Sequence, residues 1–339
     1  MTETNTRVLF NATPEGLPVP DNFRLDETPV PEPGAGQFLL RNLYLSLDPY
    51  QRMLMGGGWT YSPNVLKPGD LMVGRVLGEV VKTNNPDFPV GTHVVGRLGW
   101  QTHVLSDGSD LDFVIEAKPG VPLSAYLGVC GSTGVTAWVG LKITGQPKAG
   151  ETVVVSAAAG SVGSCVGQLA KDMGCRAVGI AGGPDKCKLV TQEFGFDACI
   201  DYKAPDLAGQ LKAAAPDGVD VYFDNVGGEI LETVMGQCNR LARIPVCGVL
   251  ARYNETGQAH GNRNMHLFFD KSLKMEGFVL NAHKAIWPQA RAELEAMVAD
   301  GRMTYRETVA DGIATAPEAF IGMLQGRNVG KQLVKLTKA

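Results

Sequence analysis

Residues 151–171 read ETVVVSAAAGSVGSCVGQLAK. The run 152–156 is β-branched and apolar, which is typical of a parallel strand that is covered on both faces. Residues 162–173 place small or apolar side chains at helical spacing and contain no proline, and a second strand-like run follows at 175–181. The stretch therefore predicts a buried strand, a glycine-rich turn and a helix.

The turn itself has the pattern Ala-x-Gly-x-x-Gly at Ala158, Gly160 and Gly163. A small first residue permits a tight turn, Gly160 lets the backbone approach phosphate groups, and Gly163 lets the helix lie close to the strand. The amino end of the helix offers free N–H groups and a partial positive charge to an anion. We interpret the turn as a binding site for the pyrophosphate of a dinucleotide, with a purely structural turn as the alternative.

The composition and the pattern of predicted elements change near residue 123. Before it, glycine, proline and short strand-like runs are typical of a mostly antiparallel β domain. After it, strands and helices alternate, which favours a doubly wound parallel sheet with helices on both faces. Strands are expected at 153–156, 177–181, 198–201, 219–224, 242–249 and 274–279, and helices at 162–173, 184–194, 206–214 and 229–240. We expect residues 1–125 and 305–339 to form the β-rich domain and residues 126–304 to form the dinucleotide-binding domain.

Length and charge exclude several classes of function. The 339 residues are enough for two domains. A net charge of -4 argues against nucleic acid or a membrane surface as the main partner. No apolar run reaches the ~18 residues that span a bilayer, and the polar amino terminus lacks the apolar core of a signal peptide. We expect a cytoplasmic protein that binds neither nucleic acid nor a membrane.

The cysteines and histidines do not form a metal-binding pattern. Seven cysteines are present, and no two of them are separated by the two-to-four-residue gap of a zinc hook. The five histidines form no ligand pattern either. We expect free thiols and no metal, although a site assembled from distant residues stays open.

The end of the second strand bears on which dinucleotide would bind. NAD enzymes usually place an acidic residue about 20 positions beyond the first glycine. Here the strand ends in Gly182 and Gly183, and Lys186 follows. Small residues leave room for a 2′-phosphate, and a lysine supplies positive charge, so we expect NADP(H) rather than NAD(H). Asp185 argues the other way unless it caps the next helix, and Lys186 could be a solvated helix residue.

A second glycine turn follows a later strand. Residues 222–228 read YFDNVGG, so Asn225 falls at the carboxyl end of a strand, where folds of this class bind ligands. The amide of Asn225 could bind a cofactor, or it could simply belong to a turn. The next strand runs into the loop 247–254, which we expect at the same edge of the sheet.

Several motifs together give the chain a specific family resemblance. They lie at 46–52, 99–101, 134–138, 157–171, 224–228, 275–278 and 328–331. The chain resembles the medium-chain dehydrogenase/reductase superfamily, and within it is similar to the zinc-free NADPH-dependent alkenal/one oxidoreductases. The resemblance implies a Rossmann sheet plus a mostly β GroES-like domain. It also implies a homodimer joined through edge strands near Lys274 to Asn281.

The resemblance further implies roles for individual residues. Gly160, Ser161, Val162 and Gly163 would contact the pyrophosphate. Lys186 and Tyr202 would lie at the 2′-phosphate, where Lys188 could share the role of Lys186. Thr136 would lie near the nicotinamide. The rest of the cofactor would be lined by Asn225, Cys247, Gly248, Tyr253, Phe278, Val279, Leu280 and Asn328.

The zinc-dependent members of the superfamily provide a contrast. Where they carry zinc ligands, this chain has Leu47-Asp48-Pro49-Tyr50 and Gly74-Arg75-Val76. The resemblance therefore implies metal-free hydride transfer to the β-carbon of a small hydrophobic α,β-unsaturated ketone or aldehyde. A hydrogen-bond donor must then stabilise the enolate oxygen.

We expect Tyr50 to be that donor. Some relatives carry a donor tyrosine shortly before the segment 275–278, but Asp270 occupies that place here. Tyr61 and Tyr253 are alternatives to Tyr50, and Tyr50 could instead be a core tyrosine with a backbone partner. Two other functions stay open, an NADPH-dependent quinone reductase of the same superfamily and a non-catalytic NADPH-binding protein.

Overall fold

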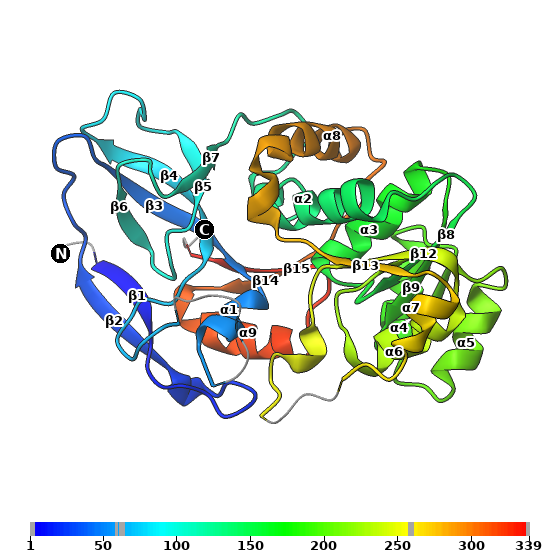
Figure 1. Ribbon diagram of the computed structural model, residues 1–339. Coiled ribbons are helices and arrows are strands. Elements are labelled where there is room, and N and C mark those ends of the chain that lie inside the picture. The colour runs from blue at the N-terminus through cyan, green and yellow to red at the C-terminus, as the bar shows by residue number, and fades with distance from the viewer. Residues whose placement is uncertain (1–3, 58–59, 61–64, 257–260, 337–339) are drawn as a thin grey trace. The chain divides into compact units, whose positions relative to one another are not determined.

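The computed structural model describes residues 4–57, 60, 65–256 and 261–336. The chain divides into two compact units (Figure 1). The first, which we call the β-rich unit, comprises Met1–Gly128, Tyr253–Thr256 and Glu307–Ala339. The second, which we call the α/β unit, comprises Val129–Arg252 and Gly257–Arg306. Among the described residues, no helix combines the length and the apolar character needed to cross a membrane.

The β-rich unit is built mainly from antiparallel strands, and only β14 and β15 among its described strand pairs are parallel. Its strands are β1 (Thr4–Phe10), β2 (Phe23–Pro29), β3 (Phe38–Leu47), β4 (Arg75–Thr83), β5 (His93–Gly96), β6 (His103–Ser106), β7 (Leu111–Val114), β14 (Glu307–Asp311) and β15 (Lys331–Lys335), and its helices are α1 (Tyr50–Leu54) and α9 (Ala316–Leu324). β1 pairs with β2, and the larger sheet has the order β14-β15-β3-β4-β5-β7, with β6 also paired to β3. β15 lies antiparallel to β3, so the carboxyl-terminal segment completes a sheet that begins near residue 38.

The core of the β-rich unit gathers around Trp100. Its indole is stacked on Phe23 with ring centroids 5.9 Å apart and lies edge-on to Phe320 at 5.6 Å. Trp100 and Phe320 are completely buried. Phe320 lies on α9, whose apolar side chains join the same cluster, so α9 is fixed to the sheet by burial of aromatic surface.

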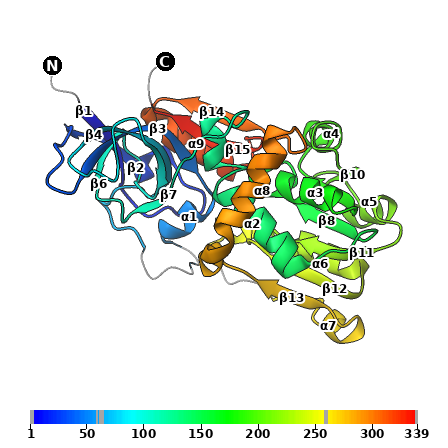
Figure 2. The same ribbon diagram turned by 90° about the horizontal axis from the view of Figure 1, so that it is seen from above.

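The α/β unit contains a parallel sheet with the order β10-β9-β8-β11-β12-β13. Its strands are β8 (Thr152–Ser156), β9 (Arg176–Ala181), β10 (Ala198–Asp201), β11 (Val219–Phe223), β12 (Cys238–Val246) and β13 (Lys274–Gly277), and its helices are α2 (Ser132–Trp138), α3 (Ser161–Asp172), α4 (Pro184–Gln192), α5 (Leu207–Ala214), α6 (Gly228–Gln237), α7 (His266–Asp270) and α8 (Trp287–Ala299). α2 packs on α3 and α8, and α5 packs on α6. Figure 2 shows β13 beyond β12 at the outer edge of this sheet.

The sequence predicted this fold class correctly, as the parallel sheet and the separate β-rich unit show. Several boundaries differ: β12 ends at Val246 rather than 249, β13 ends at Gly277 rather than 279, and α4 ends at Gln192 rather than 194. β12 begins at Cys238 rather than at residue 242, because α6 ends at Gln237 and the buried Cys238 already pairs with Val219. The strand order reverses between β8 and β11, and open α/β sheets bind ligands at such a switch point, outside the carboxyl ends of the strands.

Candidate functional site

The predicted strand, turn and helix are present at the switch point. β8 is buried along its whole length, and Gly160 caps α3 without any side-chain hydrogen bond to the first turn. A Cβ atom on Gly163 would lie 2.4 Å from the carbonyl oxygen of Ala157, so only glycine allows α3 to approach β8 this closely. The amino end of α3 therefore keeps main-chain N–H groups available to an anion.

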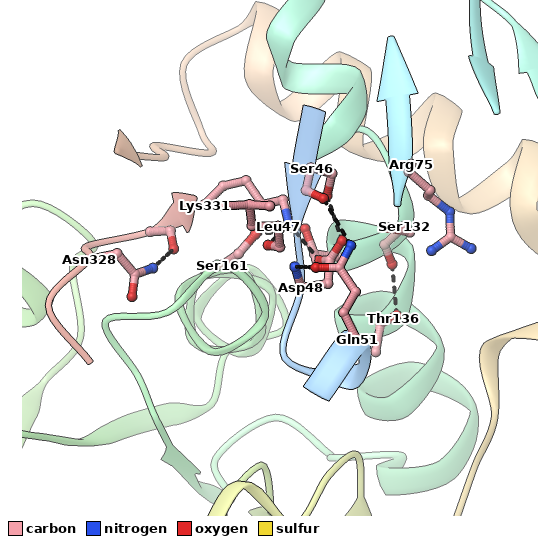
Figure 3. A network of polar contacts seen from close by, with 12 residues as sticks. Ser46, Leu47, Asp48, Gln51, Arg75, Ser132, Thr136, Ser161, Asn328 and Lys331 are labelled. Carbon is pink, nitrogen blue, oxygen red and sulfur yellow. Dashed lines mark hydrogen bonds and ion pairs between the residues drawn. The ribbon is translucent and has the colours of Figure 1, made fainter. Parts of the chain in front are cut away.

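The hydroxyl groups beside the start of α3 come from two helices. The hydroxyls of Thr133 on α2 and Ser161 on α3 are 2.6 Å apart. Thr136, the residue predicted to lie near a nicotinamide, donates its hydroxyl to the carbonyl oxygen of Ser132 at 2.7 Å (Figure 3). Thr136 is partly buried. Its hydroxyl oxygen keeps acceptor capacity while the proton is held within α2.

Positive charge gathers at the end of the second strand. A Cβ atom on Gly182 would lie 2.9 Å from the ring of Tyr202 and 3.1 Å from Cε of Lys203, so both side chains lie over this glycine. Burial and the nearby charge of Lys203 lower the pKa of Lys186. The structure thus brings together Lys186, Tyr202 and Lys203, whereas Lys188 is exposed. A group of two like charges favours an anion such as a phosphate.

Lys203 is a site residue that the sequence did not predict. The signal that could have found it is strand register: Asp201 on β10 pairs with Ala181 on β9, so the residues after each strand meet at one edge. Asp185, which was expected as a possible cap, lies in the first turn of α4 while Gly183 holds the cap position. No side-chain hydrogen bond caps α4.

Three loops follow the carboxyl ends of β11, β12 and β13. Asp224 bridges to Val246, which in turn pairs with Gly277, so the residues after these positions lie along one edge. These loops carry the predicted residues Asn225, Cys247, Gly248, Phe278, Val279 and Leu280. Burial raises the pKa of the Cys247 thiol to about 12, so the thiol stays protonated and its loop offers mainly main-chain groups.

The aromatic ring of Phe278 packs against other residues at this edge of the sheet. It lies edge-on to Phe223 with centroids 6.1 Å apart, and a Cβ atom on Gly140 would lie 2.4 Å from it. Val279, the next residue, is exposed. Phe278 therefore has a packing role within the α/β unit, in addition to the role that the family resemblance implies.

The β-rich unit holds Tyr50 on a turn built from buried polar groups. Tyr50 begins α1 and is partly buried. Asp48 accepts a hydrogen bond from Ser46 at 2.6 Å, and its main-chain N–H donates to Gln51 at 2.9 Å (Figure 3). The Nζ atom of Lys331 lies 2.5 Å from Asp48 Oδ1 and 2.8 Å from the carbonyl oxygen of Leu47. The turn before Tyr50 is thus fixed by neighbouring residues and by Lys331, which lies far away in the sequence.

Arg75 adds a buried positive charge to this region. Its Nε atom lies 2.6 Å from Asp112 Oδ2. Burial opposes its charge, but interactions with Tyr50 and Asp112 raise the pKa of Arg75 above its ordinary value. Tyr50 and Arg75 therefore interact electrostatically within the β-rich unit.

The remaining predicted residues lie as follows. Asn328 is partly buried and donates from Nδ2 to the carbonyl oxygen of Gly330 at 3.0 Å. Tyr253 groups with the β-rich unit, although the expected dinucleotide-binding domain, residues 126–304, includes it. Tyr61 lies outside the described residues. Asp270 is exposed at the end of α7, and its carbonyl oxygen accepts a hydrogen bond from Arg240.

Comparison with known proteins matches most of the chain. Residues 6–114 match a family described as the N-terminal domain of oxidoreductase, and residues 161–296 match one described as zinc-binding dehydrogenase. The chain is 43% identical to the NADPH-dependent curcumin reductase of Escherichia coli (strain K12), over 98% of this chain and 97% of that protein. It is 39% identical to the 2-alkenal reductase (NADP(+)-dependent) of Nicotiana tabacum, over 91% and 90% of the two chains.

A solved structure agrees with these relatives. The structure of CurA from Vibrio vulnificus in complex with NADPH has a TM-score of 0.92 and 39% sequence identity, and the match covers 98% of this chain and all of that one.

A zinc ion does not fit the described residues, although one matching family is described as zinc-binding. In the part of the chain that the structure describes, no three His, Cys, Asp or Glu side chains are grouped so that they could hold a metal ion. Asp48 is engaged by Lys331, and Arg75 by Asp112. The described cysteines are free thiols.

Proposed function

The chain belongs to the medium-chain dehydrogenase/reductase superfamily of oxidoreductases, and from that premise we propose that it is an NADPH-dependent enone reductase. It would reduce the carbon–carbon double bond of small hydrophobic α,β-unsaturated ketones and aldehydes without a metal. The observation that carries the proposal is the open glycine turn before α3, together with Lys186 after β9 and Lys203 after β10. Two relatives, an NADPH-dependent curcumin reductase and a 2-alkenal reductase (NADP(+)-dependent), support the same substrate and cofactor classes.

The α/β unit would hold the cofactor. Gly160 and the main-chain N–H groups of the segment 161–163 would contact the pyrophosphate, and Lys186, Tyr202 and Lys203 would bind the 2′-phosphate. The loops that follow β11, β12 and β13, with Thr136 and Asn328, would contact the remaining parts. Bound NADPH supplies a hydride, which reaches the β-carbon of the substrate.

The β-rich unit would supply the group that stabilises the substrate oxygen. Reduction at the β-carbon places negative charge on the carbonyl oxygen, and Tyr50 would donate a hydrogen bond to it. Water or Tyr50 would then deliver the proton that completes the product at the α-carbon.

The proposal is tested by following loss of NADPH absorbance with nonenal and with naphthoquinone, each also with NADH, and by identifying the product. We expect faster turnover of nonenal with NADPH and a saturated aldehyde as product. An unsaturated alcohol as product would contradict double-bond reduction. Turnover confined to naphthoquinone would identify a quinone reductase instead, and NADPH binding without any turnover would identify a binding protein.

Binding of the 2′-phosphate gives a prediction for Lys186 and Lys203. Lys186→Ala and Lys203→Ala should each raise KM for NADPH about tenfold or more, because each removes a charge-assisted hydrogen bond to phosphate. KM for NADH should stay the same. Lys212→Ala, which removes an exposed lysine of α5 in the same unit, serves as the control. Equal effects on NADPH and NADH would contradict the assignment.

We also propose a homodimer joined through β13. This strand lies at the edge of the sheet, and the apolar Val279 beyond it is 57% exposed. Pairing of two such edges across a twofold axis would extend the sheet. Sedimentation velocity at micromolar concentration should give about twice the 36.1 kDa of one chain. A species of one chain mass would contradict the dimer.

A further inference from the structure

We propose that Asp224 is a positioning residue for NADPH binding: it holds three loop segments at the carboxyl edge of the sheet in their binding arrangement. The inference rests on the proposed function, because it concerns the same cofactor. Asp224 follows β11 directly and is completely buried. It therefore acts through the loops it holds rather than by touching the cofactor.

The side chain of Asp224 organises the turn that follows β11. Its Oδ1 atom accepts hydrogen bonds from the main-chain N–H groups of Val226 at 3.0 Å and Gly227 at 2.9 Å. The same oxygen accepts from the hydroxyls of Ser156 at 3.2 Å and Tyr222 at 2.8 Å. One oxygen atom thus connects the end of β8 with the turn after β11.

The main chain of Asp224 connects a third segment. Its carbonyl oxygen accepts from the N–H groups of Cys247 at 2.8 Å and Gly248 at 3.2 Å. Its own N–H donates to the carbonyl oxygen of Pro245 at 3.0 Å. The loop after β12, which carries two of the predicted cofactor residues, is therefore fixed by the same residue.

The neighbouring Asn225 is oriented by this arrangement. Its main-chain N–H donates to Ser156 Oγ at 2.9 Å, and its side-chain Nδ2 donates to Ser156 O at 2.7 Å. Both bonds use donors of Asn225. The acceptor Oδ1 of Asn225 has no hydrogen bond within the described residues, and it is suited to a ribose hydroxyl or a carboxamide N–H of the cofactor.

Asparagine is the replacement for Asp224 that is closest to it in shape. Its Oδ2 atom is buried and has no hydrogen-bond partner among the described residues. Burial raises the pKa of Asp224, although the hydrogen bonds to its carboxyl group oppose the shift. An asparagine side chain carries no charge and keeps the Oδ1 acceptor that connects the loops.

The test compares NADPH dissociation constants, measured by calorimetry, for Asp224→Ala, Asp224→Asn and a control. The control is Asp220→Ala at the other end of the same strand, where Asp220 accepts from Thr152 N at 2.9 Å and from Asn239 Nδ2 at 2.8 Å. We expect Asp224→Ala to weaken NADPH binding about tenfold or more, with kcat at saturating NADPH within about threefold of the wild type. Asp224→Asn should stay within about threefold in Kd. Asp220→Ala should lower the melting temperature without changing Kd.

Each outcome decides the inference. Folded Asp224→Ala that binds NADPH like the wild type would overturn it, and so would Asp224→Asn that binds as weakly as Asp224→Ala. If Asp224→Ala does not fold, Ser156→Ala replaces it, and wild-type affinity in that variant would overturn the inference. A wild-type protein without affinity for NADPH would instead overturn the proposed function.

Discussion

Lys331→Met is expected to lower the free energy of unfolding of the β-rich unit by about 3–5 kcal/mol, the cost of leaving one partner of a buried ion pair alone. The side chains of Lys331 and Asp48 are 4% and 9% exposed, and their charged atoms are 2.5 Å apart. Methionine has a similar length but no charge, so the Asp48 carboxylate would keep its burial and lose its counter-ion. Urea unfolding of both proteins at neutral pH measures the difference.

The same substitution should reverse the pH dependence that Asp48 contributes. In the wild type, burial opposes the charge of Asp48, but Lys331 and Ser46 hold its pKa below the ordinary 3.8. A lowered pKa stabilises the fold above about pH 4, and this contribution is lost as the pH falls further. In Lys331→Met the pKa of Asp48 should rise instead, so the variant should lose stability as the pH increases from 4 towards 7.

The double variant Asp48→Asn/Lys331→Met is the control for this prediction. Removal of both charges should recover most of the lost stability, because a buried ion pair replaced by uncharged groups is often close to neutral. If the single variant unfolds at the same urea concentration as the wild type, the ion pair of Lys331 and Asp48 does not contribute to stability as its burial indicates. The same conclusion would follow if the variant kept the wild-type pH slope.

Tyr50→Phe is expected to lower kcat for nonenal about 10- to 1000-fold, the range for loss of one donor to a developing oxyanion. The affinity for NADPH should be unchanged, because the change removes only a hydroxyl group in the β-rich unit. Steady-state kinetics and calorimetry on the same preparations measure both quantities. Tyr44→Phe on β3 in the same unit is the matched control.

One result would contradict the role proposed for Tyr50. Wild-type turnover in Tyr50→Phe would identify Tyr50 as a structural tyrosine. Tyr253→Phe would then be examined, since Tyr253 groups with the same unit. A loss of turnover that is matched by an equal loss in Tyr44→Phe would indicate a general effect on the fold rather than on the reaction.

The sequence pattern was sufficient to predict the part of the site that one continuous run of residues forms. The strand, turn and helix at 152–172 depend on a continuous run of residues, and their β-branched and glycine pattern predicted them. The resemblance to the superfamily is also confirmed by relatives that match nearly the whole chain. The assigned roles of the individual cofactor residues stay predictions.

Features that depend on contacts between distant segments were not predictable in this way. Lys203 joins Lys186 only because of the register between β10 and β9. Lys331 and Asp48 are separated by 283 positions, so no local pattern links them. The hydrogen bonds of Asp224 likewise depend on Ser156, which ends β8, and on Cys247, which follows β12. Strand pairing, rather than composition, decides these contacts.

The position of β15 has a consequence for the order of events during synthesis. The ribosome releases β3 and its neighbours early, yet their sheet includes strands that emerge among the last residues. The α/β unit lies mostly between these segments and can fold while translation continues, since domains generally fold as units. Until residue 331 leaves the exit tunnel, the nascent chain carries Asp48 without the lysine that neutralises it. The β-rich unit is therefore completed only after most of the α/β unit has been synthesised.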